Sequence, residues 1–143
     1  MRSGVRALFL AAGLLAWAAL WAGEAAAPRT AVLGEAELGI EVVRVTLSAS
    51  GNIVDLRYRV LDPERAKGLL TKGAKVLLKD EASGKLLAVP SLGYVGSLQQ
   101  NSPDPQKGRV YYVLFNNVGQ LVKPGRKVTL ILGDRRVTGL TVI

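Results

Sequence analysis

The side chains that most often carry enzyme chemistry are nearly absent from this sequence. It contains no His and no Cys, and its single Met and two Trp, namely Met1, Trp17 and Trp21, lie close to its start. Nucleophilic catalysis would then need a Ser paired with a Lys, or carboxylate chemistry. None of the six serines after residue 28 lies in a G-x-S-x-G or S-x-x-K setting, and the sequence Ser83-Gly84-Lys85 is typical of a turn. We therefore expect no catalytic residue, and a carboxylate-based hydrolase is a remote alternative.

Metal and cofactor sites are not expected either. Copper and zinc sites are built from His, Cys or Met, which residues 28–143 lack entirely. Calcium needs clustered oxygen ligands, but the two close acidic pairs, Asp62 with Glu64 and Asp80 with Glu81, fit a helix cap and a hairpin turn. No Gly-x-x-x-x-Gly-Lys phosphate loop occurs. The sequence thus predicts a protein without cofactors.

The first 27 residues are predicted to be a secretory signal peptide. Arg2 and Arg6 precede the apolar residues 7–22, and the small residues Ala25-Ala26-Ala27 follow. This order is typical of a signal peptide, and the apolar part is short for a membrane span, although an uncleaved anchor is the alternative. We expect a periplasmic or secreted bacterial protein with no transmembrane span after cleavage. Residues 28–37 are then a leader or edge segment, and residues 38–143 form one β-sandwich domain.

The elements of this domain follow from alternating polarity. Residues 41–48 and 53–61 alternate around an Ala-Ser-Gly-Asn turn and predict a β-hairpin, with Val43, Val45 and Leu47 on one face of its first strand. Asp62 followed by Pro63 predicts the start of a short helix that ends near residues 70–71. Six further strands are predicted over residues 75–79, 86–89, 94–99, 110–115, 127–132 and 137–142. Residues 110–115 are apolar on both faces, which is typical of a central, covered strand.

About seven to eight short strands, turn signals roughly every ten residues and one short helix predict an all-β fold. The pattern favours a single immunoglobulin-like β-sandwich over a barrel. Two parts of the sequence, residues 45–51 and 55–66, resemble a group of small exported bacterial β-sandwich proteins of uncharacterised function. Gly108-Arg109-Val110-Tyr111 and Gly133-Asp134 are similar to the same group. The resemblance implies a common fold and export, and it supplies no catalytic residues.

The charge of the domain suggests one candidate surface. Residues 28–143 hold 17 Lys and Arg against 10 Asp and Glu, a net charge of +7. If consecutive strands alternate in direction, the connections 62–74, 90–93 and 116–126 lie at the same pole of the sandwich. Lys72, Lys123 and Arg126 are then candidates for binding an anionic partner, although scattered surface charge is the plainer interpretation.

These observations lead to a prediction of function in outline. We expect a non-enzymatic binding or assembly module of the bacterial envelope that recognises another protein through a sheet edge or its loops. Residues 75–79 and 86–89 are the two candidate edge strands. The alternative is a basic surface module that binds anionic lipid or polysaccharide, and export argues against nucleic acid as the partner.

Overall fold

The computed structural model describes residues 32–143, which form one compact unit. The predicted signal peptide, residues 1–27, and the first part of the leader segment lie outside the described residues. Every member of the hydrophobic core lies between Leu38 and Val142. The described unit therefore contains its own core.

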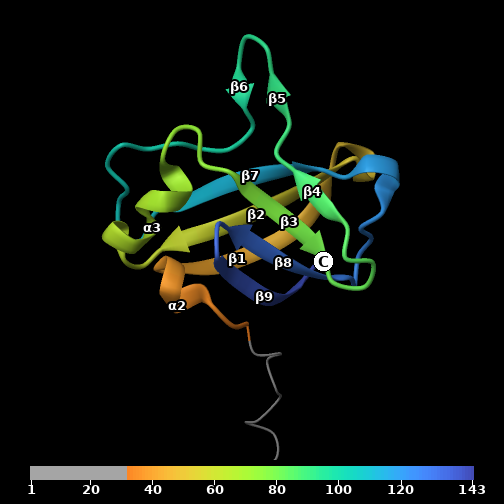
Figure 1. Ribbon diagram of the computed structural model, residues 1–143, viewed down its shortest axis with the longest axis horizontal. Helices are drawn as coiled ribbons and strands as arrows, with labels where there is room; N and C mark the ends of the chain where they lie inside the picture. Colours follow the sequence, from red (N-terminus) through yellow and green to blue (C-terminus); the bar gives the residue numbers. More distant parts are fainter. Residues whose placement is uncertain (1–31) are drawn as a thin grey trace, which may run out of the picture. The chain divides into compact units, whose positions relative to one another are not determined.

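The predicted all-β fold is confirmed, because the described chain consists mainly of antiparallel strands (Figure 1). The first sheet has the order β1-β2-β7, with β1 at Ile40–Ser48, β2 at Ile53–Val60 and β7 at Val110–Asn116. The second sheet has the order β4-β3-β8-β9, with β4 at Leu86–Ala88, β3 at Val76–Asp80, β8 at Lys127–Leu132 and β9 at Arg135–Thr141. A separate two-stranded hairpin pairs β5, Ser91–Leu92, with β6, Gly96–Ser97.

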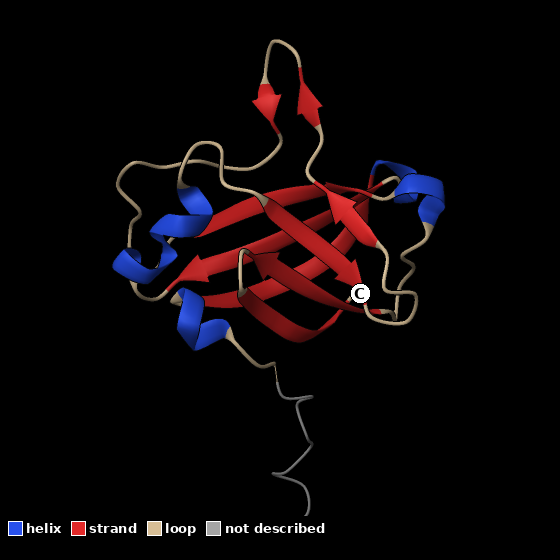
Figure 2. Cartoon of the chain, viewed as in Figure 1, coloured by secondary structure: helices blue, strands red, loops and turns tan. Residues whose placement is uncertain are grey.

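Two short α-helices lie together at one end of the sheets (Figure 2). Helix α3, Pro63–Leu70, is the predicted one: the Asp62 carboxylate accepts hydrogen bonds from the backbone N–H groups of Glu64 and Arg65, and Pro63 occupies the first turn. Helix α2, Glu35–Leu38, is a single turn that the sequence pattern did not indicate, and it buries Leu38. Two 3₁₀ turns, η1 at Ala49–Gly51 and η2 at Val118–Gln120, complete the elements.

The first hairpin is confirmed in its strands and corrected in one side chain. Along β2 every second residue is buried, as the alternation predicts, and this set comprises Val54, Leu56, Tyr58 and Val60. In β1 the prediction that Val43 shares a face with Val45 and Leu47 is wrong, because the register with β2 shifts between Val42 and Arg44. This bulge turns Val43 to the solvent and lets Val42 pack against the core.

Strand β7 is not the central strand that its composition predicts. Among the named strands it pairs with β2 alone, and on its other side it meets only the short segment around Gln99. Tyr111, Val113 and Phe115 are buried on its inner face. Its outer face is partly covered, since the guanidinium carbon of Arg57 lies 5.3 Å from the centre of the Tyr112 ring. Hydrogen bonds from the Arg57 guanidinium to the Asp55 carboxylate hold the guanidinium in place, and they raise the pKa of Arg57. Side-chain stacking can thus shelter an apolar face that no second sheet covers.

The predicted strand over residues 94–99 is also wrong as an independent strand of the sandwich. β5 and β6 form a small hairpin that projects away from both sheets (Figure 1) and is closed by a bond from Leu98 N to the Pro90 carbonyl. After it, the chain bonds to β7 through Leu98 and Gln100. β4 and this short segment run in the same direction, so together they cross the domain only once.

Among the described residues four buried side-chain polar atoms have no hydrogen-bond partner, and one of them, the Tyr58 hydroxyl, leads to a stability prediction. Tyr58 is completely buried against Tyr111, with ring centres 6.1 Å apart, and among the described residues its hydroxyl has no hydrogen-bond partner. Burial is the first cause that raises the pKa of Tyr58 above its usual value.

We expect Tyr58→Phe to leave the protein equally stable at neutral pH or more stable by up to about 1 kcal/mol, because it removes a buried hydroxyl that gains no bond in the fold. Above pH 10 the unfolded chain loses the Tyr58 proton while the folded chain retains it, so the wild-type protein loses stability as pH rises. Urea unfolding between pH 7 and 11 measures both effects. An equal alkaline loss in the variant would contradict the assignment to Tyr58.

Candidate functional site

Three of the four outer sheet edges carry hydrogen bonds from other parts of the chain. On β9, Thr138 exchanges two backbone hydrogen bonds with Leu33 of the leader segment. On β7, the segment Leu98–Gln100 takes the place of a neighbouring strand. On β1, the N–H of Ile143 donates to the Val45 carbonyl, and the Glu35 carboxylate accepts the N–H of Val42. These contacts occupy backbone groups that could otherwise pair with a foreign strand.

The fourth edge, β4, is open. Of the two candidate edges, residues 75–79 are excluded because β3 lies between β4 and β8, and residues 86–89 contain the true edge strand. The Asp80 N–H donates to the Lys85 carbonyl, and Leu87 lies opposite Leu78. Since alternate residues of a strand direct their backbone groups to opposite sides, the N–H and C=O groups of Leu86 and Ala88 point away from β3. No bond to these groups is found within residues 32–143.

A groove of about 420 Å³ runs beside this open edge. One wall is β4 with the preceding Lys85, and the other is formed by Asn116, Val118, Gly119 and Leu121 at the end of β7 and the following turn. Two aliphatic side chains on its rim stand in solvent, Leu86 at 55% and Val118 at 70% exposure. The groove thus combines unpaired backbone groups with apolar walls.

The second wall is held by the buried side chain of Asn117. Its amide nitrogen donates to the carbonyls of Gly51 and Val122 at 2.9 and 2.8 Å, and its oxygen accepts the Val122 N–H at 2.9 Å. A buried amide with these bonds ties the turn before β8 to the turn between β1 and β2. The positions of Val118 and Leu121 beside β4 are therefore set by the fold.

The first wall is held by an ion pair beneath the β3–β4 turn. The completely buried carboxylate of Asp80 accepts bonds from the N–H and hydroxyl of Ser83 at 3.2 and 2.7 Å, and it lies 3.2 Å from the half-buried guanidinium of Arg126. Gly84 closes the turn at a φ of 74°. Ser83, which the sequence left to turn chemistry, has this structural role.

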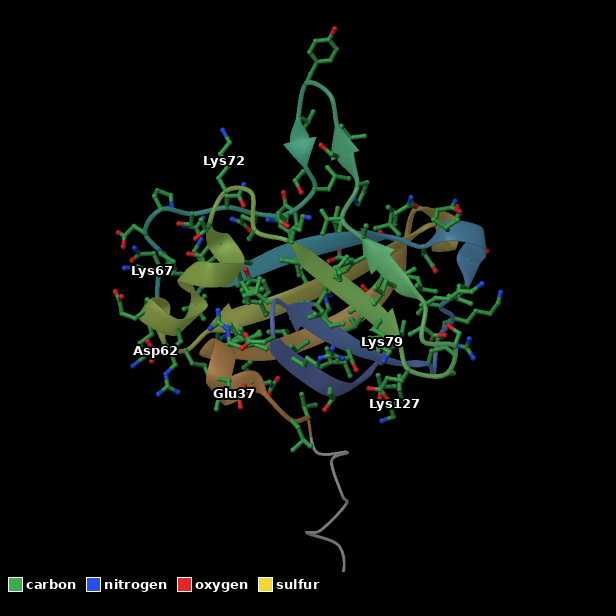
Figure 3. The ribbon with its side chains drawn as sticks, viewed as in Figure 1. Glu37, Asp62, Lys67, Lys72, Lys79 and Lys127 are labelled. Carbon is green, nitrogen blue, oxygen red and sulfur yellow. The ribbon has the colours of Figure 1, made fainter. Side chains whose placement is uncertain are left out.

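The predicted grouping of Lys72, Lys123 and Arg126 at one pole is wrong. Val76 of β3 lies opposite Leu132 of β8, and Asp80 lies opposite Val128. Arg126 therefore lies at the Asp80 end of the sheet, whereas Lys72 lines a hollow with Gly133, Asp134 and Arg135 at the other end. Figure 3 shows the same separation, with Lys72 far from Lys127.

The cause of this error is the predicted strand over residues 94–99, which the structure does not contain as a strand of either sheet. Counting residues 94–99 as a separate crossing adds one reversal of direction, which moves every later connection to the opposite pole. In the structure, β4 and the segment Leu98–Gln100 together make one crossing, so the turn before β8 lies beside the β3–β4 turn. Lys123 and Arg126 belong to that end of the domain, and they do not form a common patch with Lys72.

The carboxylates of the two close acidic pairs have protein partners in the described chain. Within residues 32–143, no three acidic, His or Cys side chains are grouped closely enough to hold a metal ion. Asp62 caps helix α3, and Asp80 is bonded to Ser83 and Arg126. In the same part of the chain, no helix has the length and apolar character needed to cross a membrane.

Comparisons of this chain with protein-family models, with curated proteins and with solved structures find no match. Sequence reasoning identified one wall as a candidate edge but missed Val118, Leu121 and Asn117. Their only local signal was an apolar, Gly-containing turn, which does not reveal the strand it lies beside.

Proposed function

We propose that this protein is a non-enzymatic binding module that recognises a partner protein by accepting an extended segment along β4. The observation that carries the proposal is the open edge at Leu86 and Ala88 beside the groove. An incoming strand would pair with the backbone groups of these two residues, and one of its side chains would enter the space between Leu86 and Val118. The other three edges already bond to other parts of the chain, so the proposal commits to β4.

We further propose an immunoglobulin-like topology for the sandwich. If the seven strands of the two sheets are lettered A, B, C, C′, E, F and G in chain order, the sheets read A-B-E and C′-C-F-G. Immunoglobulin-type folds divide their strands between two sheets in the same way, and variable-type domains add C′ beside C. In this lettering the open edge is strand C′.

The proposed setting is the bacterial envelope, with the protein periplasmic or secreted. Arg2, Arg6 and the apolar residues 7–22 support export, since they have the order of a signal peptide. A domain without Cys needs no disulfide in that compartment. The partner is accordingly expected among envelope proteins.

Leu86→Pro should abolish binding of the partner without unfolding the domain. Proline removes the N–H of Leu86, which points away from β3, and the first residue of an edge strand tolerates proline. Wild-type and variant proteins are immobilised, and envelope extract is passed over them at low and high salt. Retained proteins are identified by mass spectrometry, and the affinity of each purified candidate is then measured.

Leu86→Thr is the matched control, because it shortens the same side chain but keeps the N–H. Strand addition requires a protein that is held at both salt concentrations by the wild type and by Leu86→Thr, and lost from Leu86→Pro. Backbone pairing should depend little on ionic strength, unlike surface charge pairing. Equal retention by Leu86→Pro, or loss of all retained protein at high salt, would contradict the proposal.

A further inference from the structure

The hairpin β5–β6 exposes apolar side chains far from the core. At its turn Tyr94 is fully exposed, at 108%, and Val95 is 73% exposed, while Leu92 on β5 is 48% exposed. Figure 1 shows the hairpin standing clear of both sheets. Its side chains therefore contribute little to the core, and their exposure to water is unfavourable unless another surface covers them.

The hairpin also lies in the longest uncharged stretch of the chain. No Asp, Glu, Lys or Arg occurs from residue 86 to residue 103, in a protein where about one residue in five is charged. The polar side-chain groups of the hairpin are the hydroxyls of Ser91, Tyr94 and Ser97. An uncharged, projecting loop with an aromatic tip is suited to the boundary between lipid headgroups and acyl chains, where tyrosine places its ring in apolar surroundings and its hydroxyl in water.

Two lysines flank the base of the hairpin. Lys75 lines a hollow together with Val89, Ser97 and Gln99, at the point where the hairpin leaves the sheet. Lys72, in the same turn before β3, points in the direction in which the hairpin projects (Figure 3). Within residues 32–143, neither lysine forms an ion pair with a carboxylate. Both ammonium groups are therefore free to meet phosphate groups.

We propose that the hairpin Pro90–Leu98 is a membrane-contacting element that enters the interface of an anionic bilayer with Leu92, Tyr94 and Val95, while Lys72 and Lys75 contact lipid phosphates. The charge complementarity decides between lipid and a purely apolar protein pocket: the tip is apolar, its flanks are cationic, and the whole domain carries an excess of positive charge. The inference is independent of strand addition at β4.

The first test places a fluorescent reporter at the tip. Residues 28–143 contain the core of the described unit and no Trp, so Tyr94→Trp introduces the single indole of that chain. Cooperative thermal unfolding is checked for each variant. We expect the fluorescence emission of Tyr94→Trp to shift to shorter wavelength with vesicles that contain phosphatidylglycerol. Vesicles of phosphatidylcholine alone should cause no shift. Ile143→Trp is the matched reporter, since the C-terminus is exposed and lies away from the hairpin (Figure 1).

The second test measures sedimentation with the same vesicles. Tyr94→Ser should weaken binding about tenfold, because the tip loses its aromatic ring. Lys72→Gln and Lys75→Gln should each weaken it about fivefold at low salt, as expected for a lysine close to an anionic surface. Lys123→Gln, at the other end of the sheet, should change binding much less.

Three results would overturn the proposal. The first is an unchanged emission of Tyr94→Trp with anionic vesicles, and the second is an equal shift at Ile143→Trp. The third is vesicle binding that does not respond to the hairpin and lysine variants. Capture of a purified envelope protein that depends on Tyr94, without any vesicle binding, would assign the hairpin to a protein partner instead.

Discussion

Replacing Arg126 by Ala is expected to lower the free energy of unfolding by roughly 3 kcal/mol, because it leaves the buried Asp80 carboxylate without its cation. Asp80 is completely buried, and within the described residues its other side-chain bonds come from Ser83 to Oδ2, while Oδ1 has no partner. The guanidinium of Arg126, 3.2 Å away, is the only cationic group paired with it in residues 32–143. Urea unfolding followed by far-UV circular dichroism measures the loss.

Two further variants separate the ion pair from general charge effects. Lys123→Ala removes an exposed cation from the same turn and should change stability by less than about 0.5 kcal/mol. Asp80→Asn in the Arg126→Ala background should restore part of the lost stability, because the amide keeps an acceptor for Ser83 without a buried charge. The loss in free energy of unfolding is measured for Arg126→Ala, for Asp80→Asn and for the double variant. If the loss in the double variant equals the sum of the two single losses, the two side chains are not coupled and this explanation is wrong.

The second large effect is expected at Gly39, where Gly39→Ala should cost roughly 3 kcal/mol. Gly39 has a φ of 63°, and a β-carbon there would lie 2.7 Å from the Asp62 carbonyl oxygen and 2.8 Å from the β-carbon of Arg65. The Gly39 carbonyl also accepts the N–H groups of Leu61 and Asp62. The substitution thus adds backbone strain and forces apart helix α2 and the start of α3.

Gly84→Ala is the matched control for backbone strain alone. Gly84 has a similar φ of 74°, but nothing lies within 4 Å of the position of its β-carbon. Gly84→Ala should lower the free energy of unfolding by only about 1 kcal/mol, the usual penalty for a non-glycine residue in a left-handed conformation. Thermal and urea unfolding of the two variants, measured side by side, give the contribution of the steric clash. Equal losses in the two variants would show that crowding at Gly39 contributes nothing.

The correct predictions concern features that neighbouring residues decide. The alternation in residues 53–61 identifies the inner face of β2, because a strand turns every second side chain to the same side. Asp62-Pro63 predicts the start of α3, since the cap bonds reach only two or three residues along the chain. The final hairpin over residues 127–142 is likewise recognisable from a short turn between two alternating runs.

The wrong predictions concern features that depend on distant segments. The composition of β7 indicates a central strand, but its cover comes from the Arg57 side chain and the segment Leu98–Gln100. The register shift that exposes Val43 depends on the pairing of β1 with β2. The grouping of Lys72, Lys123 and Arg126 depended on the number of times that the chain crosses the domain, and one misread segment reversed it.

Composition and local patterns are enough to predict all-β elements and a capped helix, and they show the excess of basic residues and the absence of His and Cys. These are properties of composition and of contacts within a few residues. Three features become visible only in the folded chain: β4 is the open edge, Val118 and Leu121 lie beside it, and the β5–β6 hairpin stands free with Lys72 and Lys75 near its base. The physical reason is that edges, grooves and clusters of charge are made by segments whose order in space follows from strand pairing, and pairing is chosen by the burial of the whole core.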